Sequence, residues 1–182
     1  MIKDVLNVIN QRSSVRAYDP RPVTRDKIER CLEAARLAPS ACNAQAWTFI
    51  VVDDPELKNR LAPCTTDRLL PLNHFTKQAP VHVVFVLEPG KIMSRAGGLI
   101  KQRDFRWIDI GIAAEHFCLQ ATAEGLGTCM LGWFTERKVQ QLLHIPESKT
   151  VALIITVGYP DASNRPSRQR KPLQEIARWN GY

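Results

Sequence analysis

The chain has 182 residues and a formal net charge of +7 at pH 7, with 45% hydrophobic and 24% charged residues. This length fits one domain with a core of its own, and the composition argues against intrinsic disorder. No stretch approaches the ~18 uninterrupted apolar residues that a membrane helix needs. Polar residues near the start argue against a secretion signal. We therefore expect a single domain over residues 1–182, located in the cytoplasm and not in a membrane.

The positive charge favours an anionic partner, which could be a phosphate-bearing cofactor, a nucleic acid or a membrane surface. The five cysteines form an odd set without a CxxC pair, which argues against a disulfide framework and against a zinc site. The four histidines lack the spacing of metal ligands. We therefore expect a reducing compartment and no metal.

The spacing of apolar residues predicts helices and strands that are mixed along the chain. Helices are expected over these ranges: Lys3–Asn10, Thr24–Leu37, Asp54–Ala62, Asp104–Glu124 and Thr135–His144. Strands are expected over these ranges: Trp47–Val52, Val81–Leu87, Thr128–Leu131 and Val151–Val157. Residues 40–46 and 88–102 are expected to be loops, and the pattern over 64–77 is ambiguous.

Three of these elements are predominantly apolar. The strands Val81–Leu87 and Val151–Val157 are continuous apolar runs, which predicts a sheet covered on both faces in a layered α/β or α+β domain. The helix Asp104–Glu124 is apolar almost all round, which predicts burial in a core or in an interface.

Three segments contain residues suited to binding. In Arg12-Ser13-Ser14-Val15-Arg16, two guanidinium groups bracket two hydroxyls, a donor set that suits phosphate oxygens. A solvated basic turn is the alternative interpretation. The basic tail over residues 165–172 is either a solvated tail or a nucleic-acid patch, although it lacks the interleaved aromatic residues of a single-strand binder.

The third segment is the loop Pro39–Trp47, which is dense in small polar groups. Its Asn43 and Gln45 amides could recognise a ring that offers both donors and acceptors. An ordinary loop that satisfies its own backbone is the alternative. Cys42 has no paired base nearby in the sequence, so we interpret it as a small apolar filler and not as a nucleophile.

Taken in order, these segments resemble the nitroreductase family of FMN-dependent oxidoreductases. The matching pieces are Arg12–Arg16 with Tyr18, Ala38–Trp47, Asp109-Ile110-Gly111, Gly125-Leu126-Gly127-Thr128, Gly132, Gly158-Tyr159-Pro160 and Arg168–Leu173. The resemblance implies an α+β fold with a central, mostly antiparallel sheet flanked by helices. It also implies an intertwined homodimer with two FMN sites at the interface, in which the tail 165–182 embraces the partner subunit.

The resemblance also implies roles for individual residues. Arg12, Ser14 and Arg16 would hold the FMN phosphate, ribityl chain and pyrimidine edge, with help from the Ser13 backbone. Arg168 and Arg170 would complete the phosphate site, and Asn73 would contact the pyrimidine edge. The residues that would reach the flavin from the other subunit are Pro39, Ser40, Asn43 and Gln45. The backbone of Leu131 and Gly132 would lie against the ring, with an amide aimed at flavin N5.

The implied activity is a ping-pong reaction in which NADH or NADPH gives a hydride to flavin N5. A small electron-poor acceptor, such as a nitroaromatic compound or a quinone, is then reduced. The resemblance names no obligatory catalytic side chain. Two alternatives also agree with the resemblance: a relative that fragments flavin or removes halogen reductively, and a flavin-binding or sensing protein without turnover. A basic nucleic-acid binder is a further alternative, which the family resemblance disfavours.

Overall fold

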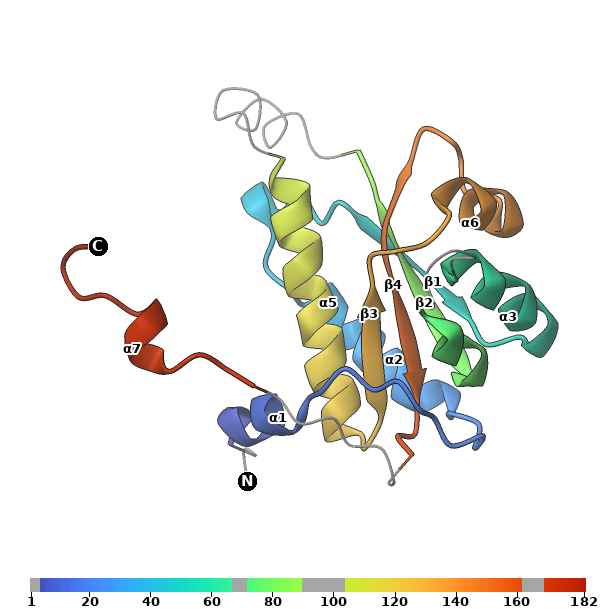
Figure 1. Cartoon of the computed structure of the whole chain (residues 1–182). Helices are drawn as coiled ribbons and strands as arrows, with labels where there is room; N and C mark the ends of the chain where they lie inside the picture. The colour runs from blue at the N-terminus through green and yellow to red at the C-terminus, as the bar shows by residue number, and fades with distance from the viewer. Residues whose placement is uncertain (1–3, 67–71, 90–103, 162–168) are drawn as a thin grey trace.

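The computed structural model describes residues 4–66, 72–89, 104–161 and 169–182 (Figure 1). Its centre is a four-stranded sheet with the order β1-β2-β4-β3. The strands are β1 (Trp47–Val52), β2 (Val81–Leu87), β3 (Gly127–Leu131) and β4 (Thr150–Gly158). Every neighbouring pair is antiparallel, which confirms the antiparallel sheet expected from the sequence.

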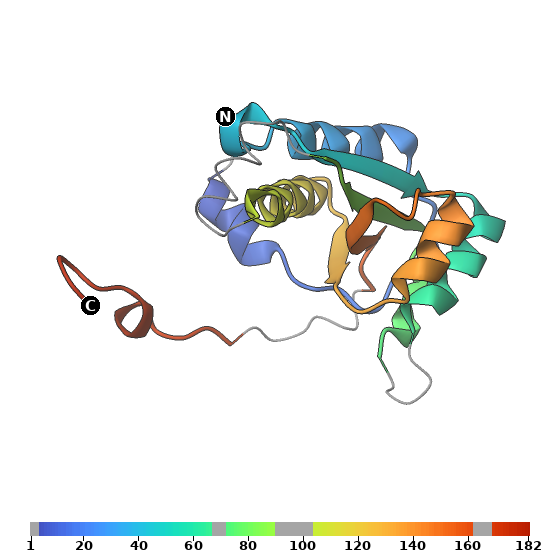
Figure 2. The same cartoon turned by 90° about the horizontal axis from the view of Figure 1, so that it is seen from above.

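Helices cover both faces of this sheet (Figure 2). One face packs against α2 (Arg25–Arg36) and α5 (Phe105–Ala123), and the other against α3 (Pro55–Leu61) and α6 (Glu136–Leu143). Successive side chains of a strand point to opposite faces, so Val83 and Phe85 join one core while Val84 and Val86 join the other. This double coverage explains why β2 is buried along its whole length and apolar at every position except His82.

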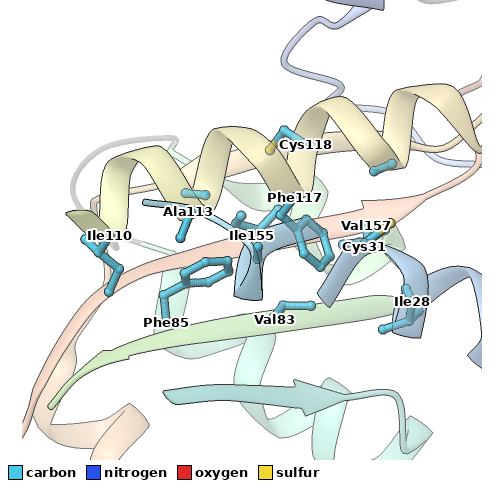
Figure 3. Packing of buried hydrophobic residues seen from close by; sticks show 14 of the residues in the cluster. Ile28, Cys31, Val83, Phe85, Ile110, Ala113, Phe117, Cys118, Ile155 and Val157 are labelled. Carbon is cyan, nitrogen blue, oxygen red and sulfur yellow. The ribbon is translucent and has the colours of Figure 1, made fainter. Parts of the chain in front are cut away.

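Aromatic rings fill the larger core, between the sheet and α5 (Figure 3). Phe85 of β2 meets Phe117 of α5 edge to face, with ring centroids 6.1 Å apart. Both side chains are fully buried, and full burial of a side chain of this size contributes about 1.5–3 kcal/mol. Ile110, Ala113 and Ile155 close the space around them. This packing fixes α5 against the sheet.

The helix starts follow from local chemistry. The Asp54 carboxylate accepts from the Leu57 amide at 2.7 Å and Pro55 opens α3, as the sequence predicts. At the start of α1 (Val5–Gln11) the Asp4 side chain caps the Leu6 amide. The region 64–77, which the pattern left ambiguous, contributes to the short 3-10 turns η2 (Ala62–Thr65) and η3 (His74–Gln78). The predicted loop before β1 holds a third short turn, η1 (Ala41–Asn43).

One side of α5 carries exposed apolar side chains. Ile110 and Phe117 are buried, whereas Trp107 and Ile108 are about half exposed, at 49% and 54%. Val5 and Leu6 of the adjacent α1 are also exposed. The sequence predicts burial of this helix on every side, and the structure buries one side. Burial of the other side in an interface stays a prediction.

The C-terminal segment with α7 (Leu173–Ile176) stands away from the body in both views (Figures 1 and 2). Its apolar side chains Leu173, Ile176 and Trp179 are exposed. Within the described ranges, no helix has the length and apolar character to cross a membrane.

Candidate functional site

The basic turn that follows α1 is fixed to the edge of the sheet. Ser14 forms a bridge with Thr128 at the start of β3, and the Val15 amide donates to the Thr128 carbonyl at 2.9 Å. The Tyr18 hydroxyl lies 3.0 Å from the Val15 carbonyl and 2.7 Å from the Thr156 hydroxyl. Burial raises the pKa of Tyr18, so this hydroxyl keeps its proton at physiological pH. The turn therefore has a defined position on β3.

Gly127 is the position where β3 and the basic turn approach most closely. A Cβ at Gly127 would lie 2.6–3.0 Å from the side-chain atoms of Val15, which is shorter than real Cβ contacts. The contact with Val15 therefore leaves no room for a side chain at position 127. This steric requirement accounts for the glycine that the sequence places just before Thr128.

The two arginines of the turn differ in their surroundings. The Arg12 Nε lies 3.4 Å from the Glu115 carboxylate on α5, and the Arg12 side chain is 16% exposed. Arg16 is exposed, and its Nη1 lies 3.5 Å from the Ser14 carbonyl. Ser13 and Ser14 are half-buried. Arg12, Ser13, Ser14 and Arg16 thus lie on one turn beside β3, and their role as a phosphate-binding group stays a prediction.

The far end of β3 carries the second group of predicted residues. Leu131 is buried, and a Cβ at Gly132 would meet no atom within 4 Å, so the backbone borders open space there. The side-chain nitrogen Nδ2 of Asn73 donates to the carbonyls of Thr65 and Trp133, at 3.0 and 3.1 Å. Asn73 thus lies next to Gly132 and holds the turn after β3. Its contact with the pyrimidine edge stays a prediction.

The loop before β1 holds the third group. The Gln45 amide donates to Ser40 Oγ at 3.0 Å, and Gln45 Nε2 donates to Asn43 Oδ1 at 2.8 Å. Cys42, Asn43 and Gln45 all have left-handed φ values of 48–52°. The interpretation of Cys42 as a buried filler is wrong, because this left-handed turn leaves Cys42 exposed.

This loop and the basic turn contact α5 on different sides. The loop is joined to Asp109, whose Oδ1 accepts from the Ala41 amide at 3.1 Å, while Arg12 of the turn pairs with Glu115. Positions 109 and 115 lie roughly 120° apart around the helix axis. Figure 2 shows the turn of η1 and the segment after α1 on opposite sides of α5. Within the described residues, the two groups of predicted site residues therefore lie on different sides of α5.

Comparison with known proteins identifies the family of this chain. The model of the nitroreductase family matches residues 9–159. The chain belongs to the nitroreductase family, and it is an oxidoreductase of that family. A relative from Archaeoglobus fulgidus, provisionally named as an NADH dehydrogenase/NAD(P)H nitroreductase, is 32% identical over 165 residues, covering 87% of each chain.

Solved structures share both fold and length with this nitroreductase-family protein. A nitroreductase family protein from Clostridium novyi is 29% identical with a TM-score of 0.78, covering 88% of this chain and 87% of that one. An FMN-dependent nitroreductase from Clostridium difficile is 26% identical with a TM-score of 0.77, covering 97% and 99%.

Two predicted site residues lie in the C-terminal tail of this nitroreductase-family chain. Arg168 lies outside the described residues. Arg170 is exposed, and its guanidinium donates to the Gln169 carbonyl at 2.8 Å. The sequence analysis assigned no role to Asp109, although a carboxylate next to Ile108 and Ile110 in a mostly apolar helix was the signal that could have drawn attention to it.

Proposed function

We propose that this oxidoreductase binds FMN and uses NADH or NADPH to reduce small electron-poor acceptors, such as nitroaromatics and quinones. One observation carries the proposal: the basic turn and the open backbone at Gly132 lie at the two ends of the same strand, β3. The rise per residue puts these ends roughly 13 Å apart, comparable with the length of a flavin mononucleotide. Relatives named for FMN dependence and for NAD(P)H nitroreductase activity support it.

The residues at the basic turn fit a phosphate. Arg12 and Arg16 supply planar donor pairs, and the hydroxyls and amides of Ser13 and Ser14 supply further donors. The exposed Arg170 of the tail, together with Arg168, would complete the group around the dianion. Because Arg12 is already held by Glu115, its guanidinium loses little conformational freedom when an anion binds.

The residues at the other end of β3 fit a flat ring. Gly132 has no side chain and borders open space, so its backbone amide can approach the ring face closely. FMN supplies the hydride chemistry, and the protein orients the ring and tunes it electrostatically. Asn73 keeps the turn after β3 in place. We assign the backbone of Leu131 and Gly132 to the ring and assign no acid or base catalyst.

The loop with Pro39, Ser40, Asn43 and Gln45 would reach the flavin of a second copy of this chain. The uncovered apolar side chains of α1, of α5 and of the tail support a homodimer, because an exposed apolar area of this kind marks an interface. The tail stands away from its own body (Figure 1), where a second subunit could receive it. No observation on the described residues favours flavin fragmentation, dehalogenation, sensing without turnover or nucleic-acid binding over this function.

The first test is the visible absorption spectrum of the purified protein, with the released chromophore identified. We expect FMN at about one per subunit. Arg16→Ala should lower FMN affinity by about tenfold or more, because a charged hydrogen bond to phosphate is lost. Arg25→Ala is the matched control, since Arg25 is an exposed arginine on α2 that pairs only locally, with Glu29. A colourless protein that does not take up added FMN would refute the proposal.

Turnover is tested separately on the FMN-loaded protein. NADH or NADPH should bleach the flavin absorbance under anaerobic conditions, and a nitroaromatic compound or a quinone should restore it within seconds. Initial rates at several concentrations of both substrates should give the parallel double-reciprocal lines of a ping-pong reaction. Bleaching without reoxidation by any such acceptor would instead indicate a flavin-binding protein that senses without turnover.

A further inference from the structure

Asp109 stands out among the buried side chains. Its side chain lies in α5 with the residue only 5% exposed, at the border between the buried side of the helix and the uncovered Trp107 and Ile108. Its Oδ1 accepts from the Ala41 amide, while its Oδ2 has no hydrogen-bond partner among the described residues. A buried carboxylate with one hydrogen bond is costly, so its presence calls for a function.

The partner of Asp109 is a loop under backbone strain. Three non-glycine residues, Cys42, Asn43 and Gln45, hold left-handed φ values. Residues in sparsely populated backbone regions keep such a conformation only where the surroundings enforce it. Hydrogen bonds within the loop, such as the one from the Gln45 amide to Ser40 Oγ, fix its shape but not its position on the protein.

The hydrogen bond from the Ala41 amide to Asp109 fixes the position of this loop on the protein. It joins the first residue of η1 to a helix that is itself fixed in the core by Ile110 and Ala113. We infer that Asp109 is a positioning residue, which holds the loop Pro39–Gln45 in the conformation that binds FMN. This inference rests on the proposed function. Asp109 acts through the loop and is not assigned a contact with the flavin.

Two variants with the same number of side-chain heavy atoms as aspartate separate the hydrogen bond from the charge. Asp109→Asn and Asp109→Leu both remove the carboxylate, but only Asn keeps an oxygen that can accept from Ala41. In Asp109→Leu we expect hydrogen exchange of the peptide containing Ala41 to accelerate by about tenfold or more, and FMN affinity to fall by a similar factor. Asp109→Asn should stay within about threefold of the wild type in both measurements.

A third variant removes the same bond from the other side. Ala41→Pro deletes the donor, and proline suits this site because Ala41 is the first residue of η1 and Ser40 before it is extended. Ala41→Pro and Asp109→Leu should have the same effect on FMN affinity, and the double variant should be no worse than either one. Thermal unfolding of Asp109→Leu should not shift downward, since the change removes a poorly partnered buried carboxylate.

Hydrogen exchange is measured by mass spectrometry on the full chain, with and without FMN. A wild-type protein that does not bind FMN would refute the proposed function, while exchange in the same samples would still decide whether Asp109 holds the loop. Unchanged exchange in Asp109→Leu would overturn the inference. Faster exchange with unchanged FMN affinity would overturn it too, because the bond would then be structural only. Equal loss in the Asn and Leu variants would also contradict it.

Discussion

His82 is a basic side chain buried in the middle of the sheet. It lies on β2, opposite Val52 and Thr156, with no exposed surface. Its ring nitrogens make no hydrogen bond of ordinary geometry among the described residues, although the Thr76 backbone is near enough to favour the charged form slightly. Burial, and to a lesser extent the charge of Lys58, lowers the pKa of His82 to about 4. The folded protein therefore holds His82 neutral.

This lowered pKa predicts a loss of stability in mild acid. Below pH 6.5 the unfolded chain binds a proton on His82 that the folded chain takes up only near pH 4, so the free energy of unfolding falls over this interval. From pH 7 to pH 5 the His82 contribution should fall by about 2 kcal/mol. Urea unfolding at the two pH values, at one protein concentration, measures the change.

The comparison variant is His82→Leu, which should lose less stability than the wild type over the same interval. His74→Gln is the control, because His74 is an exposed histidine on the nearby η3 and should leave the wild-type pH dependence unchanged. An equal dependence on pH in His82→Leu would show that other groups cause the acid destabilisation.

At the scale of elements, the contact between β3 and the basic turn leaves no room for an added side-chain atom at Gly127. Gly127→Ala puts a methyl group onto Val15, which must move together with the neighbouring Ser14 and Arg16. We expect FMN affinity to fall several-fold and stability to fall by about 1–3 kcal/mol, as for other overpacked sites. Calorimetry and FMN titration give the two values.

A second substitution tests the steric cause. Val15→Ala removes the two methyl groups that would lie 2.6 and 3.0 Å from the added Cβ but leaves the Val15 Cβ at 2.9 Å, so the double variant with Gly127→Ala should regain only part of the lost FMN affinity. Further loss in the double variant, relative to Gly127→Ala alone, would show that the two side chains do not compete for the same space.

The elements themselves were largely predictable from the sequence. β2 and β4 are apolar runs, and α3 has a local cap, so their signals lie within a few neighbouring residues. The site was predictable only in pieces. The bond from Ala41 to Asp109 spans 68 positions, which no local pattern reveals. Cys42 lies on a left-handed backbone that is unusual for cysteine, so the residue type alone did not predict that its side chain is exposed.

At the scale of the whole molecule, the C-terminal tail stands away from the body, and its large apolar side chains are exposed. Removal of residues 169–182 deletes Leu173, Ile176 and Trp179, all exposed here, together with Arg170. We expect the shortened protein to associate less strongly and to retain less FMN, because it lacks both the apolar contacts and a cation. Analytical ultracentrifugation over a range of concentrations and the ratio of flavin to protein measure the two effects.

The matched control for this truncation is Arg178→Ala, which removes a charge from the same tail and leaves its apolar residues in place. A truncated protein that remains a flavin-loaded dimer would show that the tail has no part in assembly or cofactor binding. If the truncated protein loses flavin but is still a dimer, the tail contributes to binding of the FMN phosphate and not to assembly.

The order β1-β2-β4-β3 also constrains how the chain folds during its synthesis. β4 is the last strand made, yet it lies between β2 and β3 and is paired with both. Until Gly158 has left the ribosome, β3 has no strand beside it and the sheet surface that α5 covers is incomplete. Pairing between distant segments is slow, so the growing chain displays apolar surface for most of its translation. The apolar faces of the sheet are therefore closed only when this last strand is in place between β2 and β3.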